Sequence, residues 1–225
     1  MATLQLHDQL LQFPLFLGMS RDDLNIVAGH TRLDFRKQPS QTVLIENGEP
    51  ATALCFLLTG EVSVTSSADD GSYVLEEQLS APVMLQPEVL FGYNQRYTHT
   101  FKTLTPVSLL TIDRAEVDKL STEFLIFRIN LLNLLATKVQ KMQHRPWRRH
   151  PETLSQRIIR FVADRCINPA GHKTLYILMK HLADELGDSR LDVSRALNAL
   201  QREGLVSLHR GRIVIPQMER LLSVS

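Results

Sequence analysis

The chain reads KHLADELGDSRLDVSRALNAL over residues 180–200, and this stretch has the spacing of a helix-turn-helix. Gly187 allows a sharp turn, and Ser189 with Asp192 has the form of a capping box, so a second helix is predicted to begin at Arg190. Each predicted helix has apolar residues at helical spacing that would face the core. They are Leu182, Ala183 and Leu186 in the first helix and Val193, Ala196, Leu197 and Leu200 in the second.

The second predicted helix has a polar outer face formed by Arg190, Ser194, Arg195 and Asn198. A helix in the major groove of DNA presents its N-terminal residues to base edges, where arginine can make a two-pronged contact with guanine. An unrelated helical hairpin whose arginines are only solvated is the alternative. The stretch therefore predicts a recognition helix.

Basic residues on both sides of this motif favour the same interpretation. Val206–Leu208 and Ile213–Ile215 flank residues 209–212, so a β-hairpin is predicted with Gly211 in its turn. Such a hairpin would act as a wing that contacts phosphates. The candidate DNA-binding residues are Lys180, Ser189, Arg190, Ser194, Arg195, Asn198, Arg210 and Arg212.

Residues 31–111 have the pattern of an antiparallel sandwich or barrel of about eight strands. Turn residues separate short β-branched runs, which are Val43–Ile45, Leu54–Leu58, Val62–Thr65, Val74–Leu79 and Val107–Ile112. Before them, Ser20 and Asp23 have capping-box spacing, which predicts a short helix that stops at Gly29.

After Ser121 the apolar period lengthens from two to about three and a half residues, which predicts a helix of about twenty residues. One apolar stripe of this helix consists of Leu125, Ile129, Leu132, Leu135, Val139 and Met142. We expect this stripe to form a parallel two-stranded dimer seam while a second stripe packs on the β-rich domain. A helix buried entirely within its own monomer is the alternative.

The segment His144-Arg-Pro-Trp-Arg-Arg-His-Pro151 breaks the helical pattern and marks a domain boundary. Residues 1–144 carry 11 Lys and Arg against 16 Asp and Glu, a net charge of −5, whereas residues 145–225 carry 14 against 8, a net charge of +6. This asymmetry favours a polyanionic partner for the C-terminal part, with a chance distribution of surface charge as the alternative.

Composition and motifs argue against several other classes. The sequence lacks an apolar run of membrane-spanning length and a secretory signal, so we expect a cytoplasmic protein. Cys55 and Cys166 are too few for a disulfide framework, a four-thiolate zinc site or a cysteine-ligated iron–sulfur cluster. Because common hydrolase, metalloprotease and nucleotide-binding motifs are missing, we expect no catalytic residues, no metal and no enzyme.

The predicted order of a β-rich domain, a long helix and a winged helix-turn-helix resembles the catabolite-activator/fumarate-nitrate-regulator family of bacterial transcription factors over nearly the whole chain. Residues 46–51 and 56–64 look like the family's glycine-marked turns and intervening strand, and residues 189–195 resemble its recognition-helix signature. Many members have an acidic base-reading residue where this chain has Leu191, so the usual operator is not expected.

The resemblance implies an α+β fold with a cyclic-nucleotide-binding-like β-roll over residues 1–119, a dimerisation helix over 120–144 and a winged helix-turn-helix over 145–225. It also implies a sequence-specific regulator that binds double-stranded DNA as a homodimer, on a near-palindromic site with half-sites about one helical turn apart. Rotation about residues 144–151 would regulate it. RNA polymerase is a further partner that this resemblance leaves open, and no membrane is expected.

Cyclic-nucleotide-binding members carry a Phe-Gly-Glu turn and, about ten residues later, an Arg-Ser or Arg-Thr pair. Here the corresponding residues are Phe91, Gly92, Tyr93, Arg96 and Thr98, which lack the carboxylate and the adjacent hydroxyl, so a degenerate ligand pocket is expected. We therefore expect no control by cyclic AMP and no cofactor.

Several alternatives to this interpretation stay open. Haem is one, because the sequence offers single candidate iron ligands in His7, His30, His99 and Cys55. A small apolar effector, a redox response of the cysteines, or no effector are others. A cyclic-nucleotide- or haem-responsive regulator is the alternative within the family, and a winged-helix module that binds a protein rather than DNA is the alternative outside it.

Overall fold

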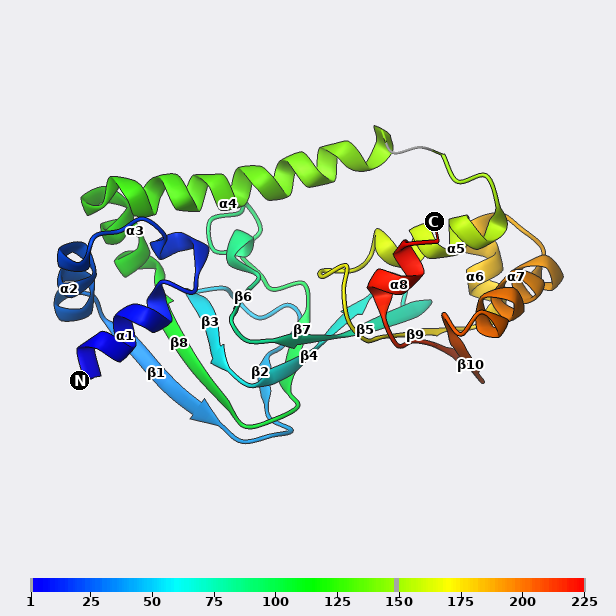
Figure 1. The fold of residues 1–225 in the computed structure, drawn as a ribbon, viewed down its shortest axis with the longest axis horizontal. Coiled ribbons are helices and arrows are strands. Elements are labelled where there is room, and N and C mark those ends of the chain that lie inside the picture. The colour runs from blue at the N-terminus through cyan, green and yellow to red at the C-terminus, as the bar shows by residue number, and fades with distance from the viewer. Residues whose placement is uncertain (1, 148–149, 225) are drawn as a thin grey trace. The chain divides into compact units, whose positions relative to one another are not determined.

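The computed structural model describes residues 2–147 and 150–224, with side chains from Leu6 onward. Its first part contains α1 (Ala2–Leu10), η1 (Pro14–Phe16), α2 (Arg21–His30), β1 (Leu33–Gln38), β2 (Val43–Ile45), β3 (Ala53–Thr59), β4 (Glu61–Ser67), β5 (Tyr73–Ser80), β6 (Val83–Leu85), η2 (Pro87–Val89), β7 (Thr100–Thr103) and β8 (Val107–Asp113). Then follow α3 (Arg114–Glu123), α4 (Leu125–His144), η3 (Arg145–Trp147), α5 (Leu154–Ala163), β9 (Lys173–Ile177), α6 (Met179–Leu186), α7 (Arg190–Arg202), β10 (Ser207–His209), β11 (Arg212–Ile215) and α8 (Met218–Leu222) (Figure 1).

Contacts divide the chain into two compact units. Unit 1 comprises residues 1–62, 80–98 and 102–147, and unit 2 comprises residues 63–79, 99–101 and 148–225. The β-rich segment is thus shared between the units, because part of it packs with the C-terminal residues. The functional boundaries predicted at 119/120 and 144/145 stay a prediction.

Unit 1 is built on a four-stranded antiparallel sheet with the order β1-β8-β3-β6. In β3 both faces are covered, since Leu54, Cys55, Phe56 and Leu57 are all buried. Aromatic rings from several elements meet over this sheet: Phe13 lies edge-on to Phe56 at 5.0 Å. These contacts join the helical N-terminal segment to the sheet and form the core of unit 1.

The long helix is confirmed as α4, whose twenty residues begin at Leu125; the predicted start at residue 120 is wrong, because residues 120–123 end the separate helix α3 and Phe124 is extended. It buries only Phe127 and Leu131, and the Phe127 ring packs on Phe16 at 5.5 Å. Asn130 fixes the same contact by donating from Nδ2 to the carbonyl oxygens of Leu15 and Leu17 at 3.1 and 2.8 Å. One face of α4 is thereby committed to the core of unit 1.

The other sheet has the strand order β10-β11-β9-β5-β4-β7-β2. Within unit 2, β9 lies between the hairpin strand β11 and β5, and Tyr73 is paired with Ile177 in the β5–β9 register. Leu75 of β5 is 1% exposed and belongs to the same core as α5, α6 and α7. The C-terminal helices therefore share a core with strand β5.

A buried ion pair joins β5 to β9. Glu77 and Lys173 are direct partners in the register, both side chains are fully buried, and Lys173 Nζ lies 3.2 Å from the Glu77 carboxylate. The backbone N–H groups of Ile167 and Asn168 donate to this carboxylate at 2.8 and 3.3 Å, while Lys173 also donates to the Ala170 carbonyl at 2.7 Å. Both charges are thus paired and hydrogen-bonded, as burial of an ion requires.

The capping box predicted at Ser20 and Asp23 is confirmed, although α2 runs past Gly29 to His30. Among the described residues, we find no single helix with the length and apolar composition of a membrane span. Helices α3 and α4 reach that length and apolar composition only when they are counted together, and the chain bends by 117° between them.

Candidate nucleic-acid interface and sensor segment

The helix-turn-helix forms at the predicted position, from α6 to α7. The side chains of Leu182 and Ala183 on α6 are buried in the core of unit 2. Those of Val193 and Leu197 on α7 are buried in the same core. Gly187 ends α6 with a φ of +62°, a left-handed conformation that glycine adopts without a steric penalty. The packing thus leaves the opposite side of α7 at the surface.

The start of α7 is held by Ser189, though the predicted capping box is only half correct. Ser189 Oγ accepts the N–H of Asp192 at 3.1 Å and donates to its carboxylate at 2.6 Å. The N–H of Ser189 donates instead to the carboxylate of Asp188 at 2.9 Å. The reciprocal bond of the box is therefore replaced, while the helix still begins at Arg190.

Arg157 on α5 supports the turn, a role that sequence reasoning missed because its partners lie about thirty residues away. Its guanidinium pairs with Asp188 and donates to the Leu186 carbonyl at 3.0 Å. The Ser189 N–H, and after it Arg157, hold the pKa of Asp188 below its usual value. Arg157 thereby ties α5 to the turn between α6 and α7, with both side chains of the pair half-buried.

The predicted recognition face lies at the surface of α7. Arg190, Arg195 and Asn198 are exposed, and Ser194 is half-buried among them. Arg195 pairs with Asp192 at 3.1 Å, and Asn198 Nδ2 donates to the Ser194 carbonyl at 2.8 Å. These are surface contacts within one helix, of a kind that contributes little and that a ligand or water readily replaces.

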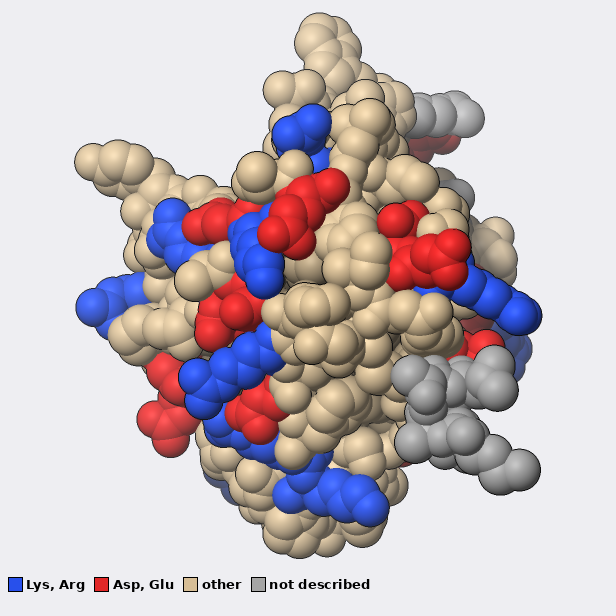
Figure 2. All heavy atoms as spheres, turned by 90° about the vertical axis from the view of Figure 1, so that its left-hand side faces the viewer, with Lys and Arg blue, Asp and Glu red and all other residues tan. Residues whose placement is uncertain are grey.

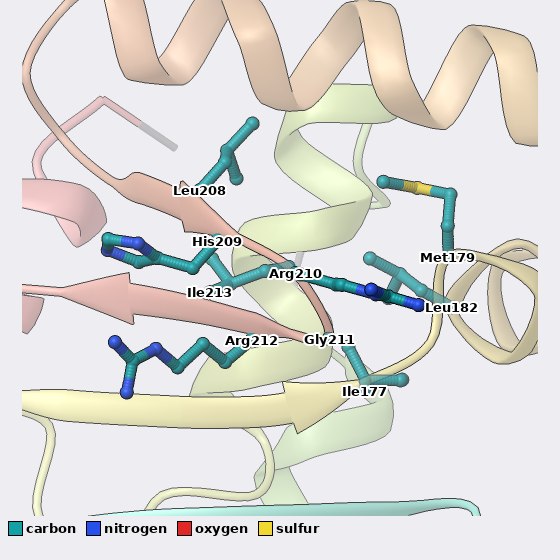
Figure 3. A pocket seen from close by; sticks show the side chains of 9 residues that line it. All are labelled: Ile177, Met179, Leu182, Leu208, His209, Arg210, Gly211, Arg212 and Ile213. Carbon is teal, nitrogen blue, oxygen red and sulfur yellow. The ribbon is translucent and has the colours of Figure 1, made fainter.

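The predicted hairpin forms from β10 and β11, with Gly211 in its turn at a φ of +73°. Arg210 and Arg212 are exposed on it, and Lys180 is exposed at the start of α6. A shallow cavity of about 230 Å³ lies between the turn and the start of α6. Figure 3 shows the Arg210 side chain extending towards Met179 and Leu182, while His209 and Arg212 point the other way along the hairpin.

This arrangement places the predicted basic residues on three neighbouring elements of unit 2, namely α6, α7 and the hairpin. The face drawn in Figure 2 gives a contrast, since Lys and Arg are interspersed there with Asp and Glu. Exposed carboxylates of Asp184, Glu185 and Asp192 stand on the same two helices, so it is the net charge of +6 over residues 145–225 that favours a polyanion.

In the predicted ligand pocket, Arg96 and Thr98 are already bonded to other residues of the protein. Arg96 Nη1 donates to the Gly48 carbonyl at 2.7 Å. The Thr98 hydroxyl accepts from Gln86 Nε2 at 2.7 Å, and the Thr98 N–H donates to Gln86 Oε1 at 3.1 Å. Tyr93 is fully exposed. Phe91 packs beneath the Arg114 guanidinium at 5.3 Å, and the half-buried Gly92 follows it.

The single residues considered as iron ligands lie in different settings. His30 is exposed and its Nδ1 lies 3.2 Å from the Ile26 carbonyl, while His99 Nδ1 lies 2.8 Å from Ser66 Oγ. His7 is buried, and its Nε2 has no hydrogen-bond partner among the described residues. In the part of the chain that the structure describes, no three His, Cys, Asp or Glu side chains gather as a metal site would need.

Cys55 lies within β3, where burial raises the pKa of its thiol from 9.0 to about 12. At pH 8 this shift lowers the thiolate fraction about a thousandfold, and the thiolate is the reactive form. We expect Cys55 in the native chain to resist iodoacetamide at pH 8, reacting more than a hundredfold more slowly than in urea. A Cys166→Ser variant isolates its signal in mass spectrometry. Labelling within minutes in the native state would contradict this placement.

Two family models match the chain in separate segments: a cyclic nucleotide-binding domain over residues 35–123 and a Crp-like helix-turn-helix domain over residues 150–224. The cAMP-activated global transcriptional regulator CRP of Haemophilus influenzae is 24% identical over 193 residues, covering 82% of this chain and 85% of that protein.

Solved structures share the fold. The catabolite activator protein of Thermus thermophilus matches with a TM-score of 0.50 and 19% identity over 94% of this chain and 98% of that one. A transcriptional regulator of the same family from Eubacterium rectale matches with a TM-score of 0.52 and 21% identity over 94% and 97%. Together with the two family models, these likenesses show that the chain belongs to the CRP/FNR family of transcription regulators.

Proposed function

We propose that this CRP/FNR-family regulator acts as a homodimer, reads a near-palindromic DNA site with α7, and does not respond to cyclic AMP. The observation that carries the proposal is the exposed N-terminal half of α7, where Arg190 begins the helix and Arg195 points away from its buried side. Such a helix can enter a major groove while the core stays intact. The wing arginines and Lys180 would contact phosphates beside it.

The apolar stripe of α4 supports the homodimer. Leu125, Ile129, Leu132, Val139 and Met142 are each between 45% and 63% exposed, and Leu135 is half-buried. Their heptad-like spacing gives a continuous seam, and a monomer seldom leaves so large an apolar patch in water. Because Phe127 and Leu131 bind α4 to its own unit, the remaining stripe is available to a second copy.

Two features of the predicted ligand pocket, residues 91–98, support control by something other than cyclic AMP. Tyr93 stands where a carboxylate would accept the ribose hydroxyls, and a phenol cannot act as a pure acceptor. Arg96 and Thr98 are engaged with Gly48 and Gln86, so a cyclic phosphate would have to displace both bonds. Both features are consistent with a regulator that binds a small effector of another kind or that binds no effector. Residues 1–119 would then act as the sensor and residues 144–151 as the hinge.

Replacing Arg195 by alanine tests the readout. If each Arg195 contacts a base edge, the change lowers affinity for the specific site by about tenfold or more and leaves non-specific binding nearly unchanged. Fluorescence anisotropy with specific and mixed-sequence duplexes measures both. The matched control is Arg220→Ala, which removes the same charge from α8.

Specific affinity that stays within about threefold in the Arg195→Ala chain would show that α7 does not read bases through this residue. A loss that is equal on specific and mixed-sequence DNA would assign Arg195 to a phosphate instead.

A further inference from the structure

Leu191 lies at the centre of the exposed face of α7 and is 60% exposed. At about 100° per residue, it stands about 160° from Val193 and about 180° from Leu200, both of which are buried. It therefore points away from the core more directly than Arg190 does. Its side chain therefore stands in the middle of the polar face of the helix proposed to enter the major groove.

The neighbours of Leu191 on that face are polar. On one side stand Ser194 and Asn198, which are bonded to each other, and on the other stands Arg195, which is paired with Asp192. An apolar side chain can neither donate to nor accept from a base edge. In the major groove, the contact open to it is with the C5-methyl group of thymine.

We propose that Leu191 is a specificity-determining residue that packs against a thymine methyl in each half-site. The inference rests on the proposed function and adds one feature to it, a base position read by apolar contact rather than by hydrogen bonds. Contact between two apolar groups removes both from water and favours thymine over a base without the methyl group.

Deoxyuridine makes a sharp test, because it differs from thymidine only by the missing methyl group. Each thymine of the selected inverted-repeat duplex is replaced in turn, and affinity is measured with the full chain. We expect one position in each half-site to weaken binding about fourfold, as the loss of one buried methyl group predicts. Changing that position in both half-sites should weaken binding more than tenfold.

The protein side of the test is Leu191→Ala. This variant should bind the thymine and deoxyuridine duplexes equally at the sensitive position, while the matched variant Gln201→Ala, at an exposed position near the end of α7, keeps the wild-type ratio. Because Leu191 is exposed, alanine is expected to leave the fold unchanged. Leu191→Met, which keeps an apolar side chain of similar size, should retain most of the discrimination.

The outcomes separate the two proposals. A specific site that depends on Arg195 but tolerates deoxyuridine at every position would overturn the role of Leu191 and leave the proposed function standing. Discrimination that persists in Leu191→Ala would also overturn it, since another residue would then contact the methyl group. If selection with the ligand-free chain yields no specific duplex, the proposed function fails in its effector-free form.

Discussion

Replacing Leu132 by glutamate is expected to abolish dimerisation and to lower affinity for an inverted-repeat site at least a hundredfold. Leu132 is 59% exposed in the middle of the α4 stripe, so a charge there would be buried unpaired in a dimer seam. A monomer holds one half-site at a time and loses the effective concentration that a linked second contact gives, typically a factor of 10²–10⁴.

The adjacent residue provides the matched control. Asn133→Glu adds the same charge one position along the same helix, at an exposed site outside the apolar stripe, and should stay dimeric. Sedimentation equilibrium gives the mass of each variant, and anisotropy on one-half-site and two-half-site duplexes gives the affinities. A Leu132→Glu chain that sediments as a dimer would contradict the assignment of this stripe to the seam.

Replacing Lys173 by methionine is expected to destabilise unit 2 by about 3–5 kcal/mol, because the Glu77 carboxylate would remain buried without its counter-charge. Domains of this size are stable by about 5–15 kcal/mol, so the loss is a large share of the total. The effect should reach both strands, since Glu77 and Lys173 face each other across the β5–β9 pair.

Amide hydrogen exchange read peptide by peptide measures this change where it arises. We expect the amide exchange rates of peptides from β5 and β9 to rise together, by roughly a factor of 10²–10³ relative to the wild type. Tyr176→Phe is the control on the same strand, because it removes only a half-exposed hydroxyl bonded to Glu76 at 3.2 Å and should cost less than about 1 kcal/mol. Faster exchange confined to β9 would contradict its pairing with β5.

A double-mutant cycle with Glu77→Gln isolates the pair itself. Each single variant leaves one buried charge, whereas the double variant leaves none. The combined loss should therefore fall well below the sum of the two single losses.

Local signals explain why the helix-turn-helix was predictable. The turn glycine, the serine cap and the apolar spacing of residues 180–200 act within a few residues, and each agrees with the others. The same holds for α4, whose apolar period persists over twenty residues. Such elements need no knowledge of distant partners.

Strand β9 was missed for the opposite reason. Its five residues begin with Lys173, a residue that strand patterns disfavour, and the carboxylate that neutralises it lies almost a hundred positions earlier on β5. The short helices α1, α3 and α8 were missed as well, because tertiary packing rather than a long periodic pattern stabilises them. The wing turn needed only local information, and its glycine was predicted.

The candidate site shows the same limits. The sequence places Arg190 and Arg195 in the first half of one helix, but Arg157 acts on the turn from another helix and leaves no local signal. Likewise, the resemblance places Tyr93 where a carboxylate is expected, while the bonds of Arg96 to Gly48 and of Thr98 to Gln86 depend on how separate loops meet.

Selection from random DNA with the purified, ligand-free full chain, followed by binding of the recovered duplexes at two salt concentrations, tests the central claim most directly. We predict enrichment of an inverted repeat whose half-sites lie about one helical turn apart, with an affinity that falls steeply as salt rises. Recovered sequences without an inverted repeat, bound no more tightly than mixed-sequence DNA, would contradict a dimer that reads DNA with α7 in the absence of an effector.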